Sequence, residues 1–496
     1  MALVQNVPFI SIIMCMVSGI VSSACGRKVA RSITIALSAV VLALNLWLTV
    51  FIAGTGQSYT YMMGHFPAPW GNELRAGLLE SVMACCFSLI LLLSLLGGLH
   101  KIKTQIHEKK QNLYCIMADL MLASLLALVY TNDIFTAYVF IEINTIAACA
   151  LIMSRQNGHC LAAATRYMIM NLLASGLLLM ALTLLYGLTG HLLMSNIRES
   201  VALLRASGEH ATALTVVVVL ITVALAIKSA LFPFHEWLPD AYGFATPASA
   251  AMLSSLISKS YLFLLIKIYY RVFGMYVVRA SHITDILFIF GVLGMILGSV
   301  SAIRSRDIRR MVAYSSVAQI GYIYMGLGLG TVEGTAAAIF HMIIHAAAKS
   351  MLFLSTSGLI DVSGDIKQFR PLRGSGYRNV AAGVAFTVGA LSMVGVPLMG
   401  GFLSKMYFAA SAVSFGGTRS IIVLAALAIS TILNTVYFLH TVVSIYRPSD
   451  RELPAYEKPD KLSGASLWVM AVLNVLLGSC SVPLYNAIIT GLNMFA

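Results

Sequence analysis

The chain has 496 residues, of which 59% are hydrophobic and only 10% are charged. Soluble globular proteins carry about 25% charged residues, and the apolar residues here come in runs of about 20. This composition indicates a helical membrane protein and excludes a secreted disulfide scaffold, a cytosolic enzyme and a nucleic-acid reader. The eight cysteines form no C-x-x-C motif and lie mostly in apolar runs, so we interpret them as small buried hydrophobic residues. We expect no cofactor and no metal, because no Cys or His cluster could hold a redox centre.

Hydropathy along the chain predicts an all-α membrane protein with about 14 transmembrane helices. The twelfth span is too long for one straight helix, and Gly395, Pro397, Gly400 and Gly401 are expected to break it near its middle. The seventh span ends in a similar way at Pro233. The predicted spans are 5–23, 32–54, 77–99, 113–130, 134–153, 163–187, 213–233, 248–271, 283–303, 311–330, 334–360, 380–413, 420–446 and 465–491.

The distribution of Lys and Arg predicts the orientation of these spans. If both termini lie outside, the inside loops hold twenty-one of the 32 basic residues, the outside loops hold six, among them Arg271, and five lysines lie within spans. This bias follows the positive-inside rule. The formal net charge of +13 therefore reflects orientation in the membrane and not a nucleic-acid partner.

Four lysines fall near the middle of predicted spans, where each would cost roughly 2.5–3.5 kcal/mol if isolated. They must face a hydrated interior or a partner. Glu142 in the fifth span is the best-placed carboxylate to pair with one of them, with a helix–helix staple as the structural alternative. Lys267 lies near a span end and is expected to reach water by snorkelling. The four central residues are Lys228, Lys259, Lys349 and Lys405.

The eleventh span carries His341, His345 and Lys349 at i, i+4 and i+8, which places them on one face over about 12 Å of helix. Histidine titrates near neutral pH, so such a column suits a proton relay. A metal site is the alternative, since His at i and i+4 is a known ligand spacing. No third ligand stands nearby on that helix, so the relay is preferred.

The segment between Lys228 and Lys259 is acidic, with His235, Glu236 and Asp240 but no Lys or Arg. An acidic loop on the inner side suggests an access or coupling point, and a tight turn capped by Asp240 explains it equally well. Weaker polar candidates in the spans are Glu80, Asp119, His440 and the face formed by Tyr314, Ser315, Ser316 and Gln319.

The segment from Lys228 to Ala241, KSALFPFHEWLPDA, resembles a signature of the antiporter-like membrane subunits. This family is shared by respiratory complex I, membrane-bound group 4 hydrogenases, formate hydrogenlyase and Mrp-type Na+/H+ antiporters. The similarity covers roughly residues 115–410 and recurs in RDIRRMVAYSSVAQIGY (306–322), HMIIHAAAKSMLFL (341–354) and GVPLMGGFLSK (395–405). Two motifs depart from the family: GLLES (77–81) stands where many relatives have D-G-L-S, and FATPASA stands for a G-A-P-T-P segment.

The resemblance implies two inverted five-helix repeats with helices seven and twelve broken. The implied organisation is an N-terminal three-helix segment (1–112), a first repeat (113–271), a second repeat (283–446) and a C-terminal helix (465–496). Glu142 and Lys228 would form a switchable ion pair whose opening drives a proton along the central axis. The remaining residues implied to carry the proton are Lys259, His341, His345, Lys349 and Lys405.

We therefore expect a non-redox, H+-translocating subunit of a redox-driven oxidoreductase complex in the inner (cytoplasmic) membrane. Expected partners are related antiporter-like subunits, other membrane subunits and iron–sulfur redox subunits on the inner side. An Mrp-type Na+/H+ antiporter subunit is the first alternative, and a stand-alone transporter of a small solute is the second. Because the chain ends soon after its last predicted span, no long lateral helix is expected.

Overall fold

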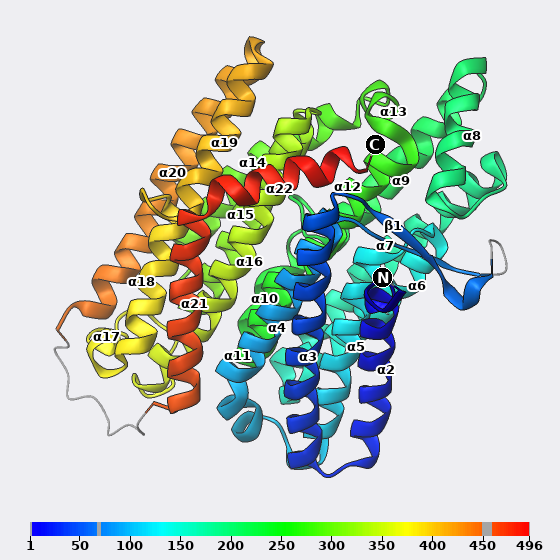
Figure 1. Cartoon of the computed structure of the whole chain (residues 1–496). Coiled ribbons are helices and arrows are strands. Elements are labelled where there is room, and N and C mark those ends of the chain that lie inside the picture. Colours follow the sequence, from blue (N-terminus) through cyan, green and yellow to red (C-terminus); the bar gives the residue numbers. More distant parts are fainter. Residues whose placement is uncertain (1, 67–70, 449–458, 496) are drawn as a thin grey trace.

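A computed structural model describes residues 2–66, 71–448 and 459–495, and it is built almost entirely of helices (Figure 1). Within this part of the chain, 12 helices are long and apolar enough to cross a membrane. Two further passes are α15 (Ile308–Gly328) and the interrupted pair α18 (Val380–Val394) and α19 (Gly400–Phe415). The fourteen predicted passes are thus all present as helices. Arg451 and Lys458, which the charge count placed inside, lie outside the described residues.

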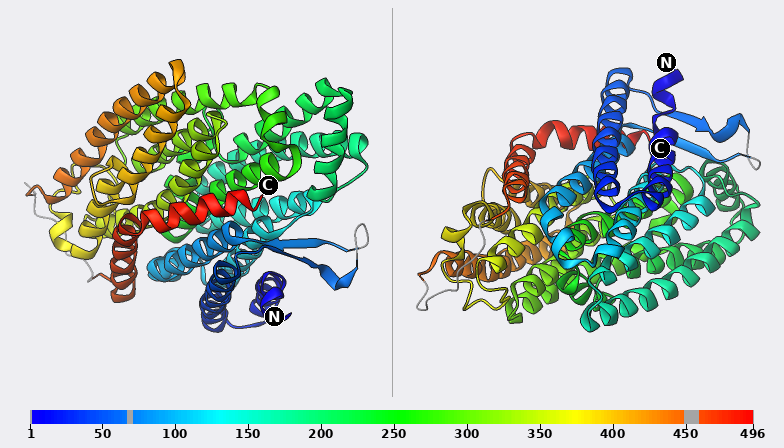
Figure 2. Two further views of the ribbon diagram at one scale, coloured as in Figure 1. Left: turned by 45° about the horizontal axis from the view of Figure 1, so that its top comes forward. Right: turned by 90° about the horizontal axis from the view of Figure 1, so that it is seen from below.

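The first eight passes alternate in direction, so that each one is antiparallel to the pass before it in the sequence (Figures 1 and 2). They are α2 (Val7–Ala24), α3 (Arg27–Thr55), α4 (Leu78–Gln105), α5 (Gln111–Tyr130), α6 (Ile134–Ile152), α7 (Gly158–Thr189), α9 (Ala211–Lys228) with α10 (Trp237–Phe244), and α11 (Pro247–Met252) continued by η4 (Leu253–Ile257), α12 (Ser258–Ile268) and η5 (Tyr269–Phe273).

The last six passes are α14 (Ile283–Arg304), α15, α16 (Val332–Asp361), α18 with α19, α20 (Gly417–Tyr446) and α21 (Lys461–Ser479). Passes four to eight and nine to thirteen each contain a broken helix in fourth place, α9/α10 in one set and α18/α19 in the other. Because each set has an odd number of passes, the second starts from the opposite face, so the two repeats are inverted.

Short elements cover the ends of the bundle. An antiparallel hairpin pairs β1 with β2, with Tyr59 opposite Ala76, and lies between the second and third passes. The other short elements are α1 (Ala2–Gln5), β1 (Tyr59–Met62), η1 (Met63–His65), β2 (Glu73–Ala76), η2 (Glu108–Lys110), η3 (Met153–Arg155), α8 (Met194–Ser207), α13 (Gly274–Ala280), α17 (Ser375–Arg378) and α22 (Ser481–Asn493).

Both ends of the described chain lie against this hairpin. The Tyr59 hydroxyl donates to the Val4 carbonyl over 3.2 Å, and Arg75 donates to the Met494 carbonyl. The face that holds the hairpin is called the terminal face below. The opposite face, which carries the loops that contain Arg304, Arg306 and Arg370, is called the basic face.

Two predicted boundaries are wrong. The last predicted span, 465–491, ends at Ser479, and α22 then lies across the bundle on the terminal face (Figure 1). Pro483 has no backbone N–H to continue the preceding helix. The predicted acidic loop after Pro233 is mostly the buried half-helix α10, whose Trp237, Leu238 and Tyr242 side chains are buried.

The tightest helix pair is α14 against α15, and small residues allow it. A Cβ built on Gly321 would lie 2.5 Å from the Met295 backbone nitrogen and 2.6 Å from the Gly291 carbonyl oxygen. In a membrane, helices associate by such close backbone packing and not by the hydrophobic effect. This pair supports the first broken helix, since α10 packs against α15.

Gly321→Ala is therefore expected to destabilise the protein by about 1–3 kcal/mol, the usual cost of overpacking. The matched control is Gly176→Ala on α7, where the new methyl group would meet nothing within 4 Å. Thermal unfolding of the two purified variants in detergent measures the difference. Equal midpoints for both would contradict this account of the packing.

Candidate functional site

The first half of the first broken helix, α9, ends at Lys228. Pro233 follows a few residues later and offers no N–H, and the chain turns between residues 229 and 236 before α10 begins. The Trp237 indole nitrogen donates to the Ile227 carbonyl over 3.3 Å, which satisfies one of the carbonyls left free at the end of α9. Lys228, whose side chain is fully buried, is the last residue of α9 and thus belongs to the carboxyl-terminal turn of this half-helix, where a cationic residue is favoured.

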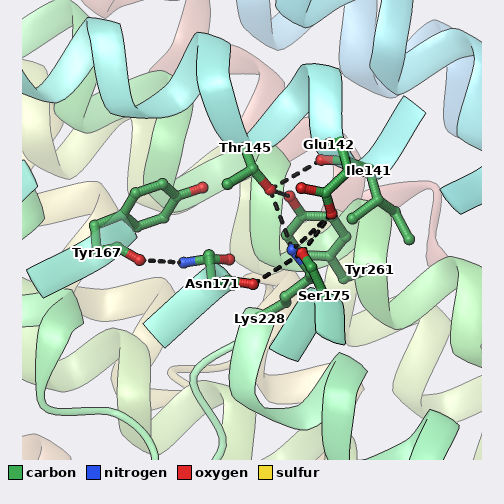
Figure 3. A network of polar contacts seen from close by, with 8 residues as sticks. All are labelled: Ile141, Glu142, Thr145, Tyr167, Asn171, Ser175, Lys228 and Tyr261. Atoms are coloured by element: carbon green, nitrogen blue, oxygen red, sulfur yellow. Dashed lines mark hydrogen bonds and ion pairs between the residues drawn. The ribbon is translucent and has the colours of Figure 1, made fainter. Parts of the chain in front are cut away.

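Glu142 on α6 lies beside this lysine, and their Oε1 and Nζ atoms are 3.6 Å apart (Figure 3). Lys228 also donates to the Thr145 hydroxyl over 3.2 Å, and Ser175 on α7 donates to Glu142 Oε1. Thr145 stands three residues after Glu142 and therefore shares its helix face. The expected pairing of Glu142 with a buried lysine is confirmed, and its use in transport stays a prediction.

Tyr261 on α12 also lies beside the Glu142–Lys228 pair. Its hydroxyl lies 3.5 Å from the Thr145 hydroxyl, and the Lys228 ammonium stands 5.8 Å from the centre of its ring (Figure 3). The lysine therefore meets a carboxylate, a hydroxyl and an aromatic face. The Glu142 side chain is 26% exposed and the Lys228 side chain 0%, so only the carboxylate end of the pair reaches the surface of this chain.

Lys259 is the second residue after the π-helical turn η4. A π turn widens the helix and frees a backbone carbonyl, and such turns occur often at functional sites. The Lys259 ammonium donates to the Ser254 carbonyl and lies 3.3 Å from the Ser258 hydroxyl. The side chain is fully buried without a carboxylate partner among the described residues. The helix that carries it packs against α16 of the second repeat.

The histidine column on α16 is buried along its whole length. The rings of His341 and His345 are parallel, 2° apart, with centroids separated by 6.0 Å. His341 Nδ1 lies 2.7 Å from the Ser404 hydroxyl, whereas both ring nitrogens of His345 lack a hydrogen-bond partner within the described part of the chain. Leaving such buried polar atoms unsatisfied costs about 1–3 kcal/mol each, which favours internal water beside His345. Lys349 donates to the Val312 carbonyl over 2.9 Å and to Ser315.

The second broken helix repeats the arrangement of the first. Lys405 on α19 donates to the Val394 carbonyl over 2.6 Å and to the Thr431 hydroxyl over 2.9 Å. Val394 is the last residue of α18, so this ammonium also sits at the carboxyl end of a half-helix. Lys405 is half-buried, unlike the other lysines of the site.

Helix α15 connects the two repeats. The Tyr324 hydroxyl lies 2.7 Å from that of Ser229, the residue after Lys228. Two residues earlier, the Tyr322 ring stacks on His341 with centroids 5.4 Å apart and lies 5.8 Å from the Lys405 ammonium. Helix α15 thus contacts both the first broken helix, at Ser229, and the residues His341 and Lys405 of the second repeat.

Glu142 on α6 pairs with Lys228 on α9, and the helices that carry the other predicted residues pack in turn, α9 against α12, α12 against α16 and α16 against α19. The seven predicted residues on these helices are called the row below. The two half-buried members, Glu142 and Lys405, are its ends, and the members between them are buried. Among the described residues, no group of three or more His, Cys, Asp and Glu side chains is placed to hold a metal ion.

Hydroxyl side chains that the sequence analysis did not single out complete this row. Thr145, Ser404 and Thr431 each contact one of its charged or titratable residues. Spacing could have found the first two, since Thr145 lies three residues after Glu142 and Ser404 directly precedes Lys405. Thr431 comes from another helix, and only the fold places it here.

The prediction for Lys267 is wrong. The side chain is fully buried and does not snorkel, because its ammonium donates to the Val129 carbonyl over 2.6 Å and to that of Thr131 at the carboxyl end of α5. Arg271, assigned to a loop, lies in η5 and is only 5% exposed. Glu80, one of the weaker candidates, is buried in the first turn of α4.

Of the other weak candidates, Ser315 contacts Lys349 of the row, whereas the contacts described for Asp119 and His440 are to residues outside it. Asp119 is buried and accepts hydrogen bonds from Ser18 over 2.7 Å and Thr34 over 3.2 Å, which ties α5 to α2 and α3. The His440 ring packs against the Phe369 ring with centroids 5.8 Å apart. A pocket of about 460 Å³ lies beside the first break and is lined by Arg166, Glu236 and Trp237, among others.

Thr145→Val tests the environment of the ion pair without removing a charge. The variant deletes a hydrogen bond to a buried ammonium, a contact typically worth about 1.5–3 kcal/mol, in a side chain of similar shape. We expect slower ion translocation with unchanged assembly, measured in proteoliposomes. Thr183→Val on the exposed side of α7 is the matched control, because its hydroxyl bonds only to its own helix. An unimpaired Thr145→Val protein would show that this hydroxyl is dispensable.

Comparison with known proteins identifies the family. A family described as "NADH:quinone oxidoreductase/Mrp antiporter, TM" matches residues 131–433. The NADH-quinone oxidoreductase subunit N of Desulforudis audaxviator is 30% identical over 442 residues, covering 87% of this chain and 85% of that protein. The putative antiporter subunit mnhD2 of Staphylococcus aureus is 25% identical over 456 residues, covering 91% and 88%.

A solved structure is similar over the whole chain. A subunit of the membrane-bound sulfane sulfur reductase, described as an archaeal respiratory membrane complex, superimposes with a TM-score of 0.87 at 25% identity and covers 100% of this chain and 97% of that one. The family match spans both broken helices and the buried row between them. The chain is therefore a multi-pass membrane protein that belongs to the NADH:quinone oxidoreductase/Mrp antiporter transmembrane family.

Proposed function

We propose that this chain translocates H+ as one membrane subunit of a redox-driven complex. The observation that carries the proposal is the buried row from Glu142 to Lys405, in which each cation has hydroxyl or carbonyl partners in place of a neutralising acid, except at the Glu142–Lys228 pair. Intramembrane ionisable groups are expensive and mark ion pathways. A row that spans both repeats gives a proton successive sites at similar depth.

The ion pair controls the first step. When Glu142 stands 3.6 Å from Lys228, the carboxylate stabilises the ammonium. When the carboxylate turns away, the ammonium is left buried with only Thr145 and the Tyr261 ring, so its proton is released to Lys259, which must be a neutral amine at this step to accept it. A proton arriving at Lys259 disfavours positive charge on the titratable groups of the adjoining helix α16, which favours the next transfer toward Lys405.

The orientation and partners follow from the same proposal. The positive-inside rule assigns the basic face to the inner side of the cytoplasmic membrane and the terminal face, with both termini, to the outer side. The redox energy comes from iron–sulfur subunits docked on the inner side, since the row itself is built of acid, amine and imidazole groups that carry protons and not electrons. The two repeats would occupy 113–271 and 283–446, with 1–112 and 465–496 as flanking segments.

An Mrp-type Na+/H+ antiporter subunit is the second candidate, and the similarity to mnhD2 favours it. Purification of the native complex in mild detergent, followed by mass spectrometry of its subunits, separates the two. Iron–sulfur subunits would support the redox-driven pump. Small hydrophobic companions without metal would support the antiporter, and Na+ extrusion from vesicles would then be assayed. Recovery of the chain alone, with a bound solute, would point to a stand-alone transporter.

A further inference from the structure

A pocket of about 440 Å³ opens on the basic face where α14 ends and α15 begins. Its charged lining is unbalanced: it contains Arg304, Arg306 and Arg310 but a single acid, Asp307. Tyr314 also lines it. None of these residues belongs to the buried row.

The acid does not neutralise the arginines. Asp307 is the N-cap of α15, and its Oδ1 atom accepts hydrogen bonds from the backbone nitrogens of Arg309 over 2.8 Å and Arg310 over 3.3 Å. Arg304 and Arg306 are exposed, and no carboxylate within the described ranges pairs with either. The Nε atom of Arg310 is buried without a hydrogen-bond partner in the same ranges. The pocket therefore offers unused donors to an anion at the amino end of a long helix.

An apolar stripe leads from this pocket along α14. Ile286, Ile289, Leu293 and Leu297 recur every three or four residues and are 38–56% exposed, and the same stripe continues into Ser301 and Arg304. With 22 residues, α14 is about 33 Å long, close to the thickness of the hydrocarbon core. Arg304 at its end therefore lies at the depth of lipid headgroups.

We propose that this pocket binds the phosphate of an anionic membrane phospholipid, whose acyl chains lie along the half of the stripe nearer the pocket, at Leu293 and Leu297. A double-chained anionic lipid fits both features at once, since guanidinium groups bind phosphate with several hydrogen bonds and the stripe takes the chains. An acidic segment of a neighbouring subunit would match the charge of the pocket but not the exposed apolar residues beside it.

The site touches the first broken helix through one residue. Arg310 donates to Asp240 of α10 over 3.1 Å, and Arg166 of α7 donates to the other oxygen of that carboxylate over 2.6 Å. A phosphate bound to Arg310 competes with Asp240 for this guanidinium. Binding of the lipid would therefore weaken a contact that holds α10, the half-helix that follows Lys228. The proposal does not depend on which ion the row carries.

The double variant Arg304→Gln/Arg306→Gln tests the site, with Arg370→Gln/Arg447→Gln as control on exposed arginines that do not line the pocket. The intact complex is purified and placed in nanodiscs of phosphatidylcholine with rising phosphatidylglycerol or cardiolipin. Retained phospholipid is then measured by native mass spectrometry. We expect the parent and the control to retain anionic lipid and the test variant to lose it at least about fivefold, corresponding to roughly 1 kcal/mol.

A photocrosslinking residue at Ser305, which lines the pocket, identifies the occupant directly. Crosslinks to phospholipid are expected. Crosslinks to another subunit, or equal lipid retention by all variants, would overturn the proposal. Stabilisation of the parent by inorganic phosphate alone, in nanodiscs of pure phosphatidylcholine and to the same extent as by anionic lipid, would assign the pocket to a soluble anion and would also overturn it.

Discussion

Lys228→Ala is expected to abolish ion translocation while the complex remains assembled. The side chain is fully buried at the end of α9, and its ammonium is the first cation of the row. Removing it leaves Glu142 with only Ser175 as a donor among the described residues, so the proton has no first site from which to leave. Translocation is measured as acidification of proteoliposomes that contain the purified complex, and assembly by native electrophoresis.

The control for this variant is Lys103→Ala, which removes an exposed lysine from α4. Lys228→Arg separates charge from transfer, because arginine keeps the positive charge but does not release its proton in proteins. We expect Lys228→Arg to assemble and to remain inactive. Normal pumping by an assembled Lys228→Ala complex would refute the proposed mechanism.

Much of the fold could be predicted from the sequence, because hydropathy responds directly to the bilayer. Every predicted pass is a helix, and the two breaks fall where Pro233 and the Gly395–Gly401 segment predicted them. The errors occur in apolar segments, because hydropathy alone does not distinguish a segment that spans the membrane from one that packs against other helices. The half-helix α10 is buried by other helices, and α22 is apolar enough to extend a span although it lies across one face.

For charged residues too, the sequence predicts which segment they lie in but not which groups they contact. The central positions of Lys228 and Lys259 follow from their places in the spans, but the partners of the buried lysines do not. Lys267 is near enough to a span end to suggest snorkelling, yet the fold places the carbonyls of Val129 and Thr131 around its ammonium. Contacts between residues far apart in sequence, such as that between the Lys405 ammonium and a hydroxyl of α20, depend on helix packing that no local pattern encodes.

Glu142→Gln is expected to slow the same step at least tenfold, whereas Glu142→Asp should keep part of the activity. Two unit charges 3.6 Å apart interact with about 4–5 kcal/mol at an effective dielectric constant of about 20. The glutamine side chain would still accept a hydrogen bond from Ser175 but would lose this attraction. Aspartate keeps the charge on a shorter side chain, so the attraction weakens without vanishing. Ion flux per redox turnover, measured in proteoliposomes, ranks the three proteins.

The comparison that decides between a switch and a staple is thermal stability measured beside ion flux in the single variants. A switch predicts that Glu142→Gln lowers the flux at unchanged thermal stability, and that adding Glu142→Gln to the inactive Lys228→Ala protein changes nothing further. A helix–helix staple predicts instead that both single variants lower thermal stability together with flux. Glu333→Gln, on an exposed carboxylate in the first turn of α16, is the matched control for loss of one acid. Full activity in both Glu142 variants would show that the pair has no part in transport, because a carboxylate that controls a neighbouring ammonium cannot be neutralised without consequence.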